Sequence, residues 1–156
     1  MPLTTAQLQT LKTELNSDPR SYGYAADILS GYVGGLRDKL NLARAGITIR
    51  RPDCDPAEIL EAIDIRDFAA SPAGVTNNQF AASWFESITQ FARVRLANTD
   101  GTKTQVRKNI DRMVNDAQGS QTRLDAVAVR TGTRAEELFG AGVVVTNDDV
   151  TNALRS

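Results

Sequence analysis

The spacing of apolar residues predicts a chain made mostly of helices. Over much of its length apolar side chains return every three or four positions, which is the period of a helix with one buried face. Leu8, Leu11 and Leu15 form such a stripe within residues 1–20, and Pro19 ends it. We expect an N-terminal helix whose few leucines pack either on their own domain or on a neighbouring subunit.

A second helix start is marked by several agreeing signals. Asp55 stands where an N-cap belongs, Pro56 occupies the first helical position, and Glu58 follows at the third position of a capping box. Cys54 and Ile59 occupy the two positions of a hydrophobic staple. These residues predict a helix that begins immediately after Asp55.

A long central helix is predicted for residues 78–97. Phe80, Trp84, Ile88 and Phe91 recur along one ridge of it and hold much of the aromatic mass of the chain. Such a broad apolar face is typical of the centre of a core. The alternative is a surface that binds a partner, since Trp and Phe are enriched at binding hot spots.

The C-terminal part, residues 120–156, predicts several short helices. Thr133 with Glu136 forms one capping box, and Thr146 with Asp149 starts the last helix in the same way. Each pair places a hydroxyl before the helix and a carboxylate three residues later.

Two short segments have the character of strands rather than helices. Residues 47–50 alternate apolar and polar side chains, and residues 143–145 are three consecutive valines. They could pair as a small ribbon. The predicted fold is therefore mainly α, a single helical domain over residues 1–156 with about six to eight helices and a possible two-stranded β ribbon.

Composition narrows the class of protein. The 156 residues are 41% hydrophobic and 24% charged, which suits a folded globular chain. With 18 basic and 19 acidic side chains the net charge is −1, and this balance argues against a dedicated nucleic-acid or anionic-membrane binder. We recognise neither a signal peptide nor an apolar run of membrane-spanning length, and we expect a soluble protein made in the host cytoplasm.

The side chains available for chemistry are few. The chain has no histidine and one cysteine, so it lacks the residues for a Ser-His-Asp triad or a zinc site. Paired carboxylates would be the remaining catalytic option, as in glycan hydrolysis. Those close in sequence are Glu58 with Glu61, Asp64 with Asp67, and Glu136 with Glu137. Capping and solvated helix faces explain them better, so we expect neither an enzyme nor a metal or cofactor.

A helix-turn-helix is the most specific alternative. Residues 120–140 place a glycine, Gly132, between two short helical patterns, as the turn of that motif requires. Arg130 and Arg134 would flank the turn and contact DNA. The second pattern carries two glutamates and stops at Gly140, which leaves little to enter a groove. A small DNA-binding regulator is thus the alternative from another functional class.

Both ends of the chain resemble a group of small structural proteins from tailed bacteriophages and prophages. The first end carries LKTELNSDP at residues 11–19, GYA within residues 22–25 and KLN at residues 39–41. The second end carries TRAEELFG at residues 133–140 and VTNDDV at residues 145–150. The likeness covers the two ends better than the middle, and its motifs are not catalytic.

The resemblance implies a non-enzymatic virion protein, located in the particle. A head–tail connector or neck subunit, adaptor-like, or a tail-associated subunit is expected, assembling into a ring or lattice; a capsid-surface decoration protein is the alternative. Its partners would be further copies of itself and other virion proteins such as portal, tail or capsid. The side chains expected to make these contacts are Leu8, Leu11, Leu15, Tyr22, Tyr24 and Tyr32.

Overall fold

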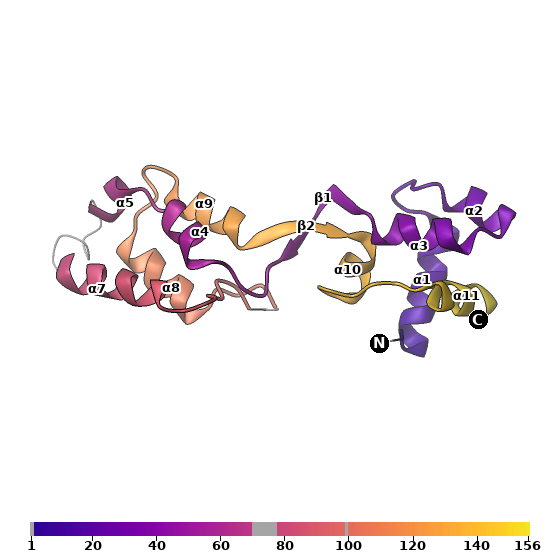
Figure 1. Cartoon of the computed structure of the whole chain (residues 1–156). Helices are drawn as coiled ribbons and strands as arrows, with labels where there is room; N and C mark the ends of the chain where they lie inside the picture. Colours follow the sequence, from indigo (N-terminus) through magenta and orange to yellow (C-terminus); the bar gives the residue numbers. More distant parts are fainter. Residues whose placement is uncertain (1, 70–77, 99) are drawn as a thin grey trace. The chain divides into compact units, whose positions relative to one another are not determined.

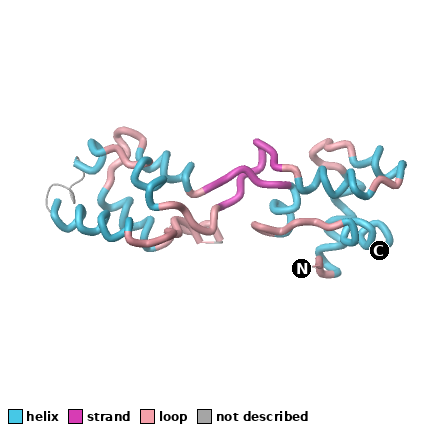
Figure 2. Tube along the Cα trace, viewed as in Figure 1, coloured by secondary structure: helices cyan, strands magenta, loops and turns pink. Residues whose placement is uncertain are grey.

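The structure, a computed structural model, describes residues 2–69, 78–98 and 100–156. It is mainly helical with one two-stranded antiparallel sheet, which confirms the predicted fold class (Figure 2). In chain order the elements are α1 (Thr5–Ser17), α2 (Tyr24–Ser30), α3 (Val33–Asn41), β1 (Ala43–Arg50), α4 (Pro56–Glu61), α5 (Ile65–Ala69), α7 (Asn78–Thr89), α8 (Gln105–Met113), α9 (Ser120–Val127), β2 (Val129–Thr133), α10 (Arg134–Phe139) and α11 (Asn147–Arg155).

The chain forms two compact units, where the sequence predicted a single domain. Unit 1 combines Met1–Ile49 with Thr131–Ser156, and unit 2 is the continuous segment Arg50–Arg130. Each unit has its own cluster of buried apolar side chains. The chain passes between the units twice, once along β1 and once along β2, which pair with each other (Figure 1).

Unit 1 is built around the predicted N-terminal helix. Thr4 and Gln7 form a capping box at the start of α1, and α1 packs against α2 and α11. Leu11 and Leu15 lie in the core of the unit together with Leu36 of α3. The apolar face of α1 is therefore buried by residues of its own unit.

The turn after α1 is organised by Asp18. This residue adopts a left-handed conformation with φ of 38°, and its carboxylate accepts hydrogen bonds from the backbone N–H groups of Tyr22, Gly23 and Tyr24 at 2.7, 2.7 and 3.2 Å. Burial acts to raise the pKa of Asp18, but these three N–H donors outweigh it and the pKa lies below its usual value of 3.8. The carboxylate thereby fixes the start of α2.

Asp18→Asn is expected to lower the free energy of unfolding by about 1–2 kcal/mol at neutral pH, because an amide nitrogen replaces one acceptor oxygen. Asparagine tolerates the left-handed backbone, so the change isolates the carboxylate. A lowered folded-state pKa contributes stability above 3.8 that is lost as pH falls through the folded value. The stability difference between the two proteins in urea denaturation should shrink as the pH falls from 3.8 through the folded value; a pH-independent difference would contradict this role of the charge.

Unit 2 confirms the helix start at Asp55 and corrects the central helix. The capping box of Asp55 and Glu58 is present, with Pro56 in the first turn. However, α7 ends at Thr89, eight residues before the predicted end. Val94 instead pairs with Cys54 through two backbone hydrogen bonds of 2.7 and 2.9 Å.

This earlier helix end changes the aromatic ridge. Ile88 is buried in the core of unit 2, whereas Phe91, beyond the helix, is 61% exposed. Val94 and Leu96 enter the core from the extended segment that follows. The side chains of Phe80 and Trp84 lie outside the described part, so the choice between core and partner surface stays open for them.

Cys54 offers a reporter for unit 2. Its side chain is fully buried, and burial raises the pKa of the thiol. We expect Cys54 to react with an aromatic disulfide reagent at pH 8 at least about a hundredfold more slowly than in urea-unfolded protein, because reaction requires the unit to open. Absorbance of the released thiolate measures this. Equal rates would show that the thiol is accessible in the folded chain.

The ribbon uses only one of the two predicted strands. Residues 47–50 do belong to a strand, β1, but its partner is β2 at residues 129–133 rather than residues 143–145. Val145 instead lies in the core of unit 1, where its backbone exchanges hydrogen bonds of 3.0 and 2.7 Å with the Asn41 side chain. A side-chain amide thus takes the place of a neighbouring strand.

Candidate functional site

The structure separates the predicted contact residues by exposure. Leu11, Leu15 and Tyr24 are buried in unit 1 and cannot meet a partner in the folded chain, so the prediction is wrong for these three. Leu8 and Tyr22 are partly buried against the same core. Tyr32 is 60% exposed and remains available.

Beside Tyr32 the structure adds a residue that sequence reasoning missed. Leu29, in the last turn of α2, is 89% exposed, the highest value among the large apolar side chains described. The helix ends at Gly31 in a left-handed conformation, and Tyr32 follows before α3 begins. We call Leu29 and Tyr32 the α2 corner. The signal that could have revealed it is a leucine two residues before a helix-ending glycine, with a glycine pair close behind.

That glycine pair holds the ring of Tyr32 in place. A Cβ atom at Gly35 would lie 2.5 Å from Tyr32 Cδ1 and 2.9 Å from Asp27 Oδ2, and one at Gly34 would lie 3.2 Å from Tyr32 Cε2. The ring therefore lies against the first turn of α3, where only glycine leaves room. An aromatic side chain that is both exposed and held by its own backbone loses little conformational freedom on binding.

The helix-turn-helix prediction is wrong. The residues between α9 and α10 form strand β2, and the two helices belong to different units. Gly132 is not a turn residue but a buried strand residue, and an added Cβ would overlap Ile49 Cγ1 on the paired strand. Glycine occurs in turns and also where two strands pack closely, so the residue type alone could not distinguish a turn from a strand at this position.

Arg134, one of the two predicted DNA contacts, is an internal structural residue. Its Nε and Nη2 donate to the two carboxylate oxygens of Glu14 at 2.8 and 2.5 Å, and its Nη1 donates to Glu137 at 2.5 Å. Glu137 also pairs with Arg20. The carboxylate of Glu14 raises the pKa of Arg134 further above its usual value. A guanidinium committed in this way cannot bind phosphate without breaking the unit.

The carboxylates considered for catalysis also have structural partners. Glu58 accepts from Arg51 at 2.8 Å, and Asp64 pairs with Arg66 at the same distance. Asp67 is fully buried and accepts the N–H groups of Gln118 and Ser120 at 2.7 and 3.1 Å, which ties α5 to the start of α9.

In the third carboxylate pair, Glu136 with Glu137, Glu136 also has a structural role. It accepts the N–H of Thr133 at 3.1 Å and that of Gly142 at 2.8 Å. In the described part, no group of three or more Cys, Asp or Glu side chains is placed to hold a metal ion. None of the described helices combines the length and apolar character of a membrane crossing.

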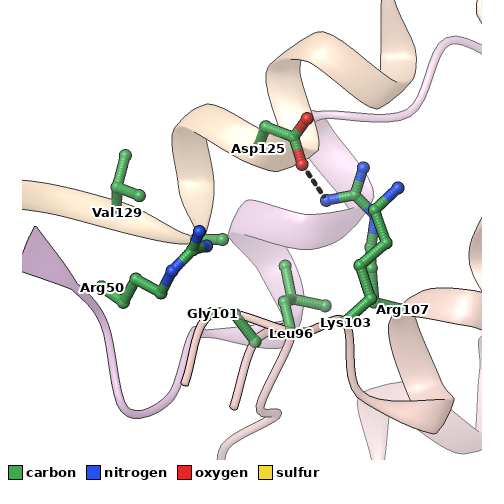
Figure 3. A pocket seen from close by; sticks show the side chains of 9 residues that line it. Arg50, Leu96, Gly101, Lys103, Arg107, Asp125 and Val129 are labelled. Atoms are coloured by element: carbon green, nitrogen blue, oxygen red, sulfur yellow. Dashed lines mark hydrogen bonds and ion pairs between the residues drawn. The ribbon is translucent and has the colours of Figure 1, made fainter. Parts of the chain in front are cut away.

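Unit 2 contains a charged hollow built around Arg107. This guanidinium is 1% exposed, and it donates to Asp111 at 2.7 Å, to Asp125 at 2.6 Å and to the carbonyl of Gln121 at 3.1 Å. Figure 3 shows it facing Asp125 on one side of the hollow, while Arg50 reaches in from the end of β1 on the other. Arg107 thus cross-links α8 and α9.

Comparisons with known proteins identify no relative. No family model, no curated protein and no solved structure matches the chain. The class defined by the structure is a mainly helical protein with two compact units and one two-stranded sheet.

Proposed function

We propose that the chain is a non-enzymatic structural subunit of a tailed-phage particle, in first place a head–tail connector or neck subunit. The observation that carries the proposal is the α2 corner, an exposed and pre-positioned apolar site in unit 1. Its partner is a neighbouring copy or another virion protein such as portal, tail or capsid.

The resemblance to phage proteins supports this choice because all its segments fall in unit 1. Residues 11–25 and 39–41 come from one end of the chain and residues 133–150 from the other, yet they fold together. Several of the shared residues hold the unit: Asp18 fixes the start of α2, and Asn41 binds the backbone of Val145. The likeness therefore concerns one folded unit.

Energetics favour assembly through the α2 corner. Moving a leucine or an aromatic side chain from water into an apolar contact contributes about 1.5–3 kcal/mol each. A ring places the same surface on every copy against a different surface of its neighbour, so one corner per chain is repeated around the ring. Contributions of this size at each contact add up to a large free energy of assembly when the same contact is repeated around a ring.

Light scattering coupled to size exclusion tests the proposal on the full chain, alone and mixed with portal or tail fractions. We expect a closed oligomer, or a stable complex with one of these fractions. Mass spectrometry of purified particles should detect the chain at many copies per particle. A strict monomer that joins no fraction and is absent from particles would refute the proposal.

A matched pair of variants tests the α2 corner. Leu29→Glu should shift the assembly towards monomer by at least about tenfold in dissociation constant, because a charge would be buried at the contact. Ile65→Glu is the control, since Ile65 is 73% exposed in unit 2. Equal effects of the two substitutions, or none from either, would show that the α2 corner is not the contact.

A further inference from the structure

The hollow in unit 2 has the size and lining of a small ligand site. Its volume is about 390 Å³, within the usual range for ligand pockets. Its apolar lining comes from Leu96, Ala97, Ala128 and Val129, and its polar lining from Arg50, Lys103, Arg107 and Asp125. Charged groups thus face each other across an apolar floor, as the labelled side chains in Figure 3 show.

The cations on one side of the hollow are already neutralised. Arg107 binds Asp111 and Asp125, and Lys103 donates to the second oxygen of Asp111 at 2.6 Å. Two carboxylates therefore balance two cations. An incoming anion gains little from this side of the hollow.

Arg50 differs from these cations, because its guanidinium makes no hydrogen bond or ion pair with any residue in the described ranges. Arg50 is an exposed residue, and its guanidinium lies beside Gly101. A Cβ at Gly101 would lie 3.1 Å from Arg50 Nε and 3.2 Å from Nη2, so Gly101 lies close to the guanidinium; its φ of 89° is a backbone conformation that favours glycine. Arg50 therefore lines the hollow with N–H groups that are free to donate.

The nearest carboxylate does not satisfy Arg50. Asp100 feels its charge, but the Oδ1 atom of Asp100 accepts from the backbone N–H and the hydroxyl of Thr102 at 2.9 and 2.7 Å. Asp100 therefore reduces the positive potential at the hollow without using the donors of Arg50. Removing its charge should favour an anionic ligand.

We propose that the hollow binds an organic oxyanion, a carboxylate or phosphate monoester carried on a small apolar group. The planar guanidinium of Arg50 donates to two of its oxygens, as arginine does with both groups. The apolar body lies on Leu96 and Ala128. This site is independent of the assembly role proposed above.

NMR titration of the 15N-labelled full chain tests the site with benzoate, phenyl phosphate, inorganic phosphate and benzylamine as probes. We expect saturable shifts of the Gly101 amide and of the Arg50 Nε–H with benzoate or phenyl phosphate, and the tighter of the two identifies the oxyanion. Inorganic phosphate should bind at least about tenfold more weakly than phenyl phosphate, since it lacks the apolar body. Equal binding of those two, or binding of benzylamine at this site, would overturn the proposal.

Three variants make the test specific. Arg50→Ala should weaken binding at least about tenfold, because charge-assisted hydrogen bonds are lost. Asp100→Asn keeps an acceptor for Thr102 but removes the charge, and should tighten binding several-fold. Arg37→Ala in α3, a partly buried arginine of unit 1 paired with its neighbour Asp38, is the control and should change nothing. Shifts that persist in Arg50→Ala, or no saturable shifts in the unmodified chain, would overturn the proposal.

Discussion

Replacing Arg134 with alanine is expected to lower the free energy of unfolding of unit 1 by about 3–5 kcal/mol. Glu14, its bidentate partner, is 4% exposed, and the substitution would leave that carboxylate buried without its counter-charge. Losses of this size follow from the removal of one member of a buried pair, and they form a large fraction of the stability of a small domain. Urea denaturation followed by circular dichroism measures the change.

Two further variants separate the ion pair from other causes. Glu14→Leu combined with Arg134→Leu should recover most of the loss, because an apolar pair of similar volume has no charge to desolvate. Glu137→Gln removes the more exposed ion-pair partner of Arg134 and should cost at most about 1 kcal/mol. If the double variant is as unstable as Arg134→Ala, packing rather than charge explains the effect.

Gly132→Val is expected to destabilise the ribbon by about 3 kcal/mol, the upper end of the usual range for overpacking. The new Cβ would overlap Ile49 Cγ1 and lie 3.2 Å from Ile49 Cβ. Those atoms stand next to the backbone of a β-branched residue and cannot turn away as the end of a flexible side chain can. The two strands must therefore separate locally, and thermal unfolding should begin at a lower temperature.

Gly46 provides the control within the same ribbon. It lies in β1 with nothing within 4 Å of an added Cβ, so Gly46→Ala should be neutral or slightly stabilising. Ile49→Ala should restore part of the stability lost in Gly132→Val by opening space. A Gly132→Val protein as stable as the unmodified chain would show that the strands are not packed as closely as described.

Local signals predicted the helix starts well. Asp55, Thr133 and Thr146 cap helices as expected, because a capping box depends only on residues three positions apart. The leucine stripe of residues 1–20 likewise indicated a helix with one buried face. It could not indicate what covers that face, which here is another part of the same unit.

Features that depend on distant residues could not be predicted in this way. The sequence around Gly132 is compatible with a turn and with a strand. Only the contact with Ile49, some eighty positions away, shows that it is a strand. The exposure of Leu29 and the unused donors of Arg50 are also properties of the tertiary arrangement. The leucine shortly before Gly31 hints at the α2 corner, but no local pattern marks Arg50, and the exposure of both depends on the fold.

The double passage of the chain through the ribbon has a consequence for biosynthesis. Unit 2 is one continuous segment, Arg50–Arg130, and its core is complete once that segment has left the ribosome. Unit 1 needs Ala135, Val145 and Val150 to close its core, so its first 49 residues must wait for the last 26. Domains usually form from the N-terminus onwards during synthesis. Here the middle of the chain should fold first. Until the C-terminal residues are made, the leucines of the N-terminal helix stay exposed, and this helix is the segment that chaperones are expected to bind.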